Sequence, residues 1–321
     1  MSIDASPQAI HAFDIHSDGS AHIATDVAPH PAPGAAYRWL HFDLSDPFLT
    51  DWATQLPLAA ARSLLAAKTR PRVATHDSAL IVTLRGINRN AGAEAEDMVS
   101  LRLWVTSELV VSVRRVRVFA MDDLRSDIDR GHAPPTAGRL LARVCENVAG
   151  HIEAVSVDLE ERADDLEEMI YDDGRLDAPE LAPMHRMAIR LRRHIGPLSD
   201  ALLDLTEIET PLLPQALRDR LRDNANRVRR SVEEVTEVRD RLQTLTTHLN
   251  LSNDARLGRN SYLLSVVAAI FLPLGFLTGL FGVNLAGMPG TEAPYAFALL
   301  CAGVAVLGVA VFVVLRWIKW F

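Results

Sequence analysis

The sequence predicts an α+β membrane protein with an N-terminal cytoplasmic α/β domain, a long helical stalk and two C-terminal transmembrane helices. Three observations carry this prediction. Strand and turn signals alternate through the first part of the chain, a helical stretch without a strong breaker follows, and two long uncharged apolar runs lie near the C-terminus. We expect domain boundaries at 1–135 for the α/β domain, 136–260 for the cytoplasmic helices with the stalk, and 261–321 for the membrane part.

Period-two patterns and turns define the α/β domain. Residues 11–25 alternate around Ser17-Asp18-Gly19, which is a hairpin signal because Asp-Gly tolerates the positive φ of tight turns. We expect further strands at 37–44, 79–87, 100–107 and 109–116, and helices near 49–56, 59–67 and 121–130. The proline break at residues 132–135 then ends the domain.

Helical patterns replace the strand signals after this break. We expect helices at about 137–172, 178–209 and 214–282. At 1.5 Å per residue, a helix of roughly 70 residues would be about 100 Å long, so we interpret the third helix as a stalk. Apolar residues recur on one of its faces at spacings of three and four, which predicts packing against other helices: Val235, Val238, Leu242, Leu245 and Leu249.

Two uncharged runs are long enough to cross a bilayer. The first extends from Ser261 to Val283 and the second from Pro294 to Leu315. About 22 helical residues at about 1.5 Å each span roughly 33 Å, which is enough for the hydrocarbon core of a membrane. The N-terminal segment has neither the basic start nor the apolar centre of a signal peptide, so we expect the preceding residues to stay in the cytoplasm.

Basic residues flank the two spans on one side only. Arg256 and Arg259 precede the first span, and Arg316 and Lys319 follow the second. The connecting loop at 283–293 contains no Lys or Arg. By the positive-inside rule, we expect both termini in the cytoplasm and the loop on the outer side.

Signals for several other functions are missing from the sequence. It has no Walker A loop, nucleophile elbow or HExxH motif, so we expect no enzymatic activity. The net charge of −8 argues against a nucleic-acid partner, and the basic cluster Arg114, Arg115 and Arg117 reads as the solvated face of a strand. Only two cysteines are present, which excludes a disulfide framework.

Histidines crowd the N-terminal part of the chain and invite a zinc-site interpretation. They show no H-x3-H spacing and have no cysteine partner at zinc-ligand spacing. We therefore interpret them as surface residues: His11, His16, His22, His30 and His41.

A second face of the third helix is polar in its cytoplasmic part and small within the membrane. The cytoplasmic members are Glu233, Glu237, Asp240, Thr244, Thr247, Leu251, Asp254 and Gly258. The series continues in the first span, and ends two residues before Asn284, as Ser261, Ser265, Ala268, Leu272, Gly275, Gly279 and Gly282. Small residues let membrane helices approach closely. The stripe also fits the lining of an aqueous pore, which would need several copies of the chain because two helices cannot enclose a path for water.

The outer loop carries one acidic residue, Glu292, and no basic one. A solvated loop acid is one interpretation. The other is that Glu292, repeated around the axis of an oligomer, raises the local concentration of cations at the mouth of a pore.

The end of the first span resembles a known family. Gly282-Val283-Asn284 follows the apolar segment Phe271 to Phe281 and precedes a short outer loop, a second span and a basic-aromatic tail, as in the CorA metal-ion transporter family. The magnesium-transporting members carry Gly-Met-Asn. The Val283 of this chain resembles the ZntB-like zinc transporter branch, as do the segments LTGLFGVN, TRPRV (69–73), LRGIN (84–88) and EDMVSLRLWV (96–105).

The resemblance implies a homopentamer in the cytoplasmic (inner) membrane, with a cytoplasmic α/β funnel and a pore lined by the first span of each copy. It assigns Gly282, Val283 and Asn284 to an outer selectivity filter, where Asn284 meets a hydrated ion transiently, and Leu272 to a constriction. The other expected pore-lining residues are those of the stripe: Asp254, Gly258, Ser261, Ser265, Gly275 and Gly279.

The resemblance also implies a cargo. Zn²⁺ or a related divalent cation is the expected transported ion, coupling to protons is a hypothesis, and no resident cofactor is expected. Two alternatives stay open at this point. One is a membrane-anchored, metal-responsive sensor or scaffold without flux, and the other is a CorA-type channel for Mg²⁺ or Co²⁺.

Overall fold

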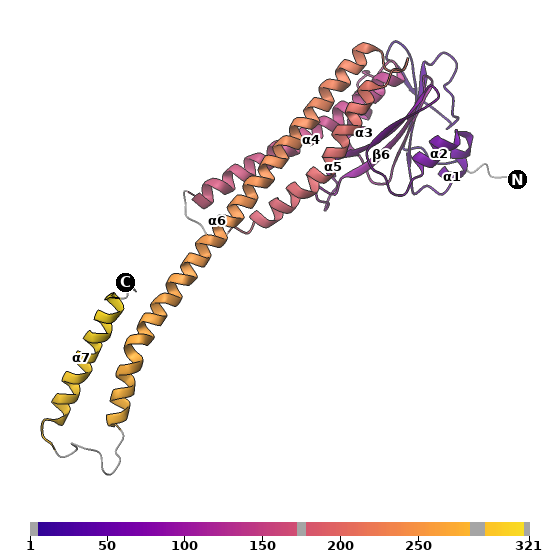
Figure 1. Cartoon of the computed structure of the whole chain (residues 1–321). Helices are drawn as coiled ribbons and strands as arrows, with labels where there is room; N and C mark the ends of the chain where they lie inside the picture. The colour runs from indigo at the N-terminus through magenta and orange to yellow at the C-terminus, as the bar shows by residue number, and fades with distance from the viewer. Residues whose placement is uncertain (1–5, 172–177, 283–292, 318–321) are drawn as a thin grey trace. The chain divides into compact units, whose positions relative to one another are not determined.

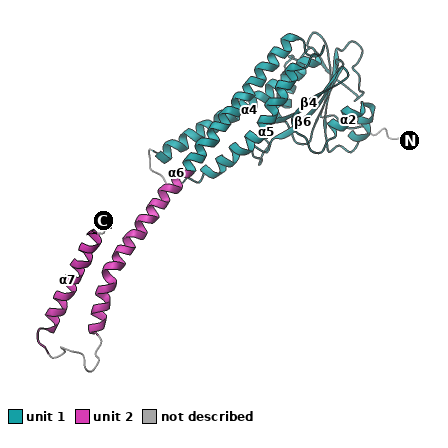
Figure 2. Ribbon diagram, in the orientation of Figure 1, with its two compact units in different colours: residues 1–246 teal, residues 247–321 magenta. Residues whose placement is uncertain are grey.

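The computed structural model describes residues 6–171, 178–282 and 293–317 (Figure 1). The chain divides into two compact units, residues 1–246 and residues 247–321 (Figure 2). The first contains a sheet and long helices, and the second contains two apolar helical segments. The predicted fold class, with an α/β domain, a long helix and two apolar C-terminal helices, is confirmed.

Within the described residues, seven strands form one sheet in the order β2-β1-β3-β7-β6-β5-β4. β3 and β7 pair in parallel, and the other neighbours are antiparallel. The predicted hairpin and the four further predicted strands are all present. The strand bounds are β1 His11–Ile15, β2 Ala21–Ile23, β3 Tyr37–Asp43, β4 Arg72–His76, β5 Ala79–Gly86, β6 Val99–Val105 and β7 Leu109–Arg114.

The strand β4 was not predicted from the sequence. It forms one edge of the sheet and pairs only with β5, with Val73 opposite Val82. Every residue of β4 is exposed or half-buried. An edge strand of this kind buries no apolar face deeply, so it lacks the alternation by which the other strands are recognised.

Helices cover the sheet. The short helices α1 (Leu49–Trp52) and α2 (Leu58–Leu64) bury their apolar side chains in a cluster with alternate residues of β3, β5, β6 and β7. The helix α3 (Phe119–Asp129) contacts α4 (Ala137–Tyr171), and α4 also contacts β5 and β6. The helix α5 (Leu181–Glu207) contacts β4 and β5.

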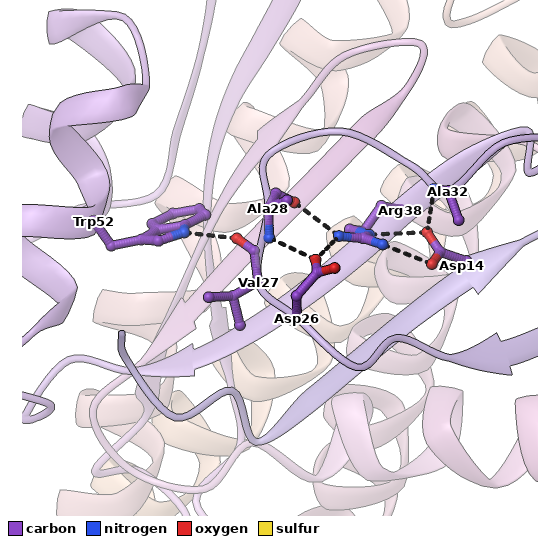
Figure 3. A network of polar contacts seen from close by, with 7 residues as sticks. All are labelled: Asp14, Asp26, Val27, Ala28, Ala32, Arg38 and Trp52. Carbon is purple, nitrogen blue, oxygen red and sulfur yellow. Dashed lines mark hydrogen bonds and ion pairs between the residues drawn. The ribbon is translucent and has the colours of Figure 1, made fainter. Parts of the chain in front are cut away.

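A buried ion pair joins β1 to β3 (Figure 3). Arg38 and Asp14 face each other across the strands and are only 3% and 6% exposed. Arg38 donates from Nε and Nη2 to the two carboxylate oxygens of Asp14, at 2.8 and 2.7 Å. Burial raises the pKa of Asp14, but the hydrogen bonds from Arg38 and from the Ala32 amide, together with the charge of Arg38, outweigh it, so that pKa lies below its usual value.

The same arginine orders the segment between β2 and β3. Arg38 also pairs with Asp26 and donates to the carbonyl oxygen of Ala28 at 3.2 Å (Figure 3). Trp52 of α1 donates from Nε1 to the carbonyl oxygen of Val27 at 2.7 Å. The one buried guanidinium thus donates hydrogen bonds from its own strand to the neighbouring strand and to the loop. This corner of the domain is therefore held by charge-assisted hydrogen bonds as well as by apolar packing.

The long helix α6 runs from Gln215 to Gly282 as one element of 68 residues. Its predicted packing face is buried in the first unit, where Val235, Val238, Leu242 and Leu245 are at most 2% exposed. Ion pairs join this part of α6 to α4, with Arg227 on Glu153 at 2.5 Å and Arg241 on Glu167 at 2.6 Å. The predicted helices at 137–172, 178–209 and 214–282 therefore match α4, α5 and α6 within a few residues.

The second unit contains the end of α6 and the helix α7 (Ala296–Trp317). The most apolar stretches of α6 and α7 have mean hydropathies of 2.3 and 2.9 and are almost entirely exposed in the single chain. Exposed apolar helices of this length are suited to a lipid environment.

The surface prediction for the histidines was wrong for His41. This side chain is fully buried in β3, and its Nδ1 lies 2.8 Å from the Oγ of Ser112. The ring of His11, which is half-buried, stacks on it with the centroids 5.7 Å apart. β3 lies inside the sheet with both faces covered, so a histidine in this strand is buried whichever way it points.

We expect the protein to lose stability at acid pH through His41. Burial lowers the pKa of His41 well below its usual value, and the positive charge of Arg114 adds to the effect. The unfolded chain protonates this histidine near pH ~6.5 while the folded chain does not, so its contribution to stability is present above about pH 6.5 and is lost as the pH falls. Below that pH the loss is at most about 1.4 kcal/mol per pH unit.

The measurement is the unfolding temperature of the detergent-solubilised protein at about pH 7.5 and about pH 5.5. His41→Gln should show a smaller decrease between the two values than the wild type. His30→Gln is the control, because His30 is exposed, and it should keep the wild-type decrease. An equal decrease in wild type and His41→Gln would contradict the assignment.

Candidate functional site

The small-residue stripe of α6 is uncovered in the single chain. Asp254, Gly258 and all the stripe members from Ser261 to Gly282 are exposed, with Leu272 at 75%. A Cβ placed on Gly275 or Gly279 would meet no other atom within 4 Å. The stripe therefore presents small side chains and open space along about 42 Å of helix, by the rise of 1.5 Å per residue between Asp254 and Gly282.

The second helix of this unit covers a different face of α6. Val266 is buried, and Pro273, Leu274 and Leu277 are half-buried. Leu274 Cδ2 lies 3.8 Å from the position that a Cβ on Gly308 of α7 would occupy. At about 100° per residue, these positions lie roughly 150° around the helix from the stripe. The small residues are thus not used to pack the two spans of one chain against each other.

Two hydroxyl groups of the span are satisfied by its own backbone. Ser265 donates from Oγ to the carbonyl oxygen of Ser261 at 2.9 Å, and Thr278 donates from Oγ1 to that of Leu274 at 3.0 Å. Such bonds let hydroxyl side chains lie in an apolar environment. They leave the acceptor lone pairs of the Ser265 hydroxyl facing the open side of the stripe.

Large apolar side chains occupy the remaining exposed surface of both helices. They include Phe271, Phe276, Phe297, Leu299, Val306 and Val309, each more than 60% exposed. The uncovered surface of this unit thus has two kinds of face, one of bulky apolar side chains and one of small or hydroxylated side chains. Bulky apolar groups suit contact with lipid, whereas small groups suit a path for water or a neighbouring helix.

The predicted outer filter lies mostly beyond the described part of the chain. Gly282 is the last residue of α6, and Val283, Asn284 and Glu292 lie outside the described residues. Elsewhere, among the residues that the structure describes, no three His, Cys, Asp or Glu side chains form a group that could hold a metal ion. The described part of this site therefore consists of an exposed small-residue face without a cluster of metal ligands.

The sequence matches a known family over most of its length. Residues 34–317 match the family described as CorA-like Mg²⁺ transporter protein. This chain belongs to the CorA-like family. The resemblance noted in the residues around Gly282 thus extends to nearly the whole chain.

Related proteins of the CorA-like family are similar over most of their lengths. The zinc transport protein ZntB of Pectobacterium carotovorum subsp. carotovorum (strain PC1) is 31% identical over 306 residues, which is 93% of this chain and 92% of the relative. The divalent cation transporter CmaX of Pseudomonas aeruginosa (strain PAO1) is 33% identical over 289 residues, 87% of each chain. The solved structure of the full-length CmaX protein has a TM-score of 0.83 and 30% identity, and the match covers 98% of this chain and 100% of that one.

We expect the stripe to face water and the outer face of α7 to face lipid. Leu272→Cys and Val306→Cys make a matched pair, because the two side chains are 75% and 69% exposed and lie near the middle of their spans. A charged thiol reagent reacts with the thiolate, which forms in water and not in lipid. In membrane vesicles Leu272→Cys should therefore react much faster than Val306→Cys.

The pair is made in a Cys301→Ala background, because Cys301 is exposed. Cys145 can stay, since burial raises the pKa of its thiol to about 12. Similar slow reaction at both positions would mean that the stripe is closed by helix packing, and would contradict the pore-lining interpretation.

Proposed function

We propose that the protein conducts divalent cations, with Zn²⁺ as the main cargo, across the cytoplasmic membrane through a pore at the centre of a homopentamer. The observation that carries this proposal is the uncovered face of α6, where Ser261, Ser265, Gly275 and Gly279 lead toward Gly282. In this proposal each copy contributes that face to the wall of the pore. The covered face of α6 and the helix α7 separate the wall from lipid.

Family membership supports divalent cations as the cargo class. One relative is named a zinc transport protein and the other a divalent cation transporter, and each is similar over most of this chain. Zinc is the finer part of the proposal. It rests on the ZntB relative and on Val283, which stands in the filter motif where magnesium-transporting members carry methionine.

An oligomer follows from the chemistry of the bilayer. Two helices cannot surround water, and water is needed where an ion crosses the hydrocarbon core. The number five and the cytoplasmic funnel come from the family resemblance. The orientation, with both termini in the cytoplasm, comes from Arg256, Arg259, Arg316 and Lys319 on one side of the spans.

The proposed filter uses weak, neutral ligands. A ring of Asn284 side chains and neighbouring carbonyl groups would present oxygen atoms that hydrogen-bond the water shell of a divalent ion without holding the ion as tightly as carboxylates or thiolates do. Glu292, repeated around the mouth, would act through its field. Charge of this kind raises the local cation concentration and is screened over a Debye length of about 8 Å at physiological salt.

The test is uptake of radioactive Zn²⁺ into proteoliposomes. We expect uptake above that of empty vesicles, and Zn²⁺ should be taken up faster than Mg²⁺ or Co²⁺. A sensor or scaffold would give no uptake above empty vesicles, and a CorA-type channel for Mg²⁺ or Co²⁺ would reverse the order of ions. The same assay with an inward proton gradient tests proton coupling, because a coupled transporter speeds up and an uncoupled pore does not.

We expect Asn284→Ala to reduce uptake steeply at every salt concentration. The substitution removes the side-chain oxygen of the filter and adds neither charge nor bulk. Uptake is measured in vesicles at low and at physiological ionic strength, and native mass spectrometry checks that the variant assembles as the wild type does. Normal uptake by a correctly assembled Asn284→Ala protein would reject the filter assignment.

Glu292→Gln is the matched comparison in the same loop. Because its proposed role is long-range attraction, the variant should slow uptake at low ionic strength, approach wild type as salt rises, and preserve the ranking of the ions. A salt-independent loss with a changed ranking would mean that Glu292 contacts the ion directly, and the attraction account would fail.

A further inference from the structure

The first unit contains a pocket rich in positive charge. Its volume is about 820 Å³, and it is lined by the loop at 67–71, by Arg85 of β5, by Ser100 of β6 and by Arg193, His194 and Pro197 of α5. Residues 69–73, which partly overlap this loop, carry part of the family resemblance, and no role for the pocket follows from the sequence. The elements that form it come together only in the fold.

Within the described residues, no ion pair neutralises the cations of this pocket. Lys68, Arg70, Arg85 and Arg193 line it, and none of the lining residues, all of which the structure describes, is Asp or Glu. Across the described residues, the ion pairs within 4.0 Å include none of these four side chains.

Asp97, whose charge acts on His194 of the pocket, and the adjacent Glu96 already have a basic partner. Glu96 and Asp97 lie 3.9 and 3.6 Å from Arg190, which is on α5 outside the pocket. Burial, followed by the charges of Arg85 and Arg193, lowers the pKa of His194, and Asp97 only partly opposes this effect. The charges of the two arginines therefore add to the effect of burial in disfavouring a proton on His194.

Two arginines, Arg85 of the pocket lining and Arg102 of β6, bind carbonyl groups in place of carboxylates. Arg85 donates to the carbonyl oxygens of Thr69 and Met98, each at 3.0 Å, and its Nε is buried without a partner. Arg102, only 2% exposed, donates twice to the carbonyl oxygen of Ala66, and its Nη1 is also buried without a partner. Neutral acceptors orient a guanidinium but do not cancel its charge, and an uncompensated buried charge is costly.

We propose that this pocket binds a small phosphate-bearing anion. Guanidinium and ammonium groups are the side chains that recognise phosphate oxygens, and here they approach one volume from a loop, a strand and a helix. The bound anion would offset the charge of Arg85 and join the 67–71 loop to α5. No Phe, Tyr or Trp side chain lines the pocket, so the proposed recognition is of the phosphate groups and not of a base. This proposal does not depend on the transport function.

The test uses inorganic pyrophosphate and the full-length protein in detergent, in metal-free buffer of constant ionic strength. Isothermal titration calorimetry should show saturable binding with one site per chain. Lys68→Gln and Arg193→Gln should each weaken binding by about tenfold, which corresponds to ~1.4 kcal/mol. Both side chains are exposed and neither is in an ion pair of the described chain, so the variants should fold, with unfolding temperatures near that of wild type without pyrophosphate.

The matched control is Arg186→Gln. Arg186 is an exposed residue of α5 two helical turns before Arg193, on the same side of the helix but outside the pocket. It should leave the affinity within about twofold of wild type, a difference well under 1.4 kcal/mol. An equal loss in Arg186→Gln and Arg193→Gln would mean diffuse attraction to a basic surface and would overturn the site.

A second arm compares tripolyphosphate with ATP. Similar affinities support recognition through phosphate groups alone, whereas ATP binding more than tenfold tighter would contradict it. Absence of saturable binding to any of these anions would overturn the proposal, and would mean that solvent or another copy of the chain neutralises the cluster. Neither result depends on whether the protein transports ions.

Discussion

The hydrocarbon core of a bilayer offers no hydrogen-bond partners to polar groups. This constraint limits which residues in the membrane part of the chain can face lipid. The last turns of α6 have one face of small and hydroxylated residues, which the other helix of the same chain does not cover. A lipid-facing helix gains from bulky apolar side chains, and such side chains are present elsewhere on α6 and α7. The proposed pore accounts for the uncovered stripe, because in it further copies of the chain, arranged around water, keep this face away from lipid.

The helix α6 contributes to both units because its apolar residues lie on one face and its acidic or small residues lie on another. In the first unit, α6 buries an apolar face against neighbouring helices and forms ion pairs with α4 through Arg227 and Arg241. In the second unit, Val266 and Leu274 lie on the side covered by α7. In both units the face with the acidic or small residues stays exposed. This division is what lets one element form a packed stalk and the wall of a proposed pathway.

Most of the fold could be predicted from local patterns, because its strongest signals are local. The two spans follow from the absence of charge over long runs, and α6 follows from the lack of breakers and from periodic apolar residues such as Val238 and Leu242. The edge strand β4 was missed because it buries little. The burial of His41 was missed because it depends on what covers β3, which is a property of the tertiary structure.

Less of the candidate site than of the fold could be predicted from the sequence. The stripe could be predicted from the sequence as a periodic series. The structure shows in addition that the stripe is exposed and that α7 packs against another face of α6. The roles of Asn284 and Glu292 stay predictions, since both residues lie outside the described part of the chain. The basic pocket had no signal in the sequence, because Lys68, Arg85 and Arg193 are far apart along the chain and meet only through the packing of α5 on β4 and β5.

The central claim is that several copies of the chain together complete the wall of the pathway. Native mass spectrometry of the detergent-solubilised protein tests it directly, because the mass of the complex gives the number of 35.3 kDa chains. The account predicts a stable complex of five chains that persists as detergent is stripped away in the gas phase. A stable monomer or dimer would contradict it, because so few copies of α6 could not enclose an aqueous path.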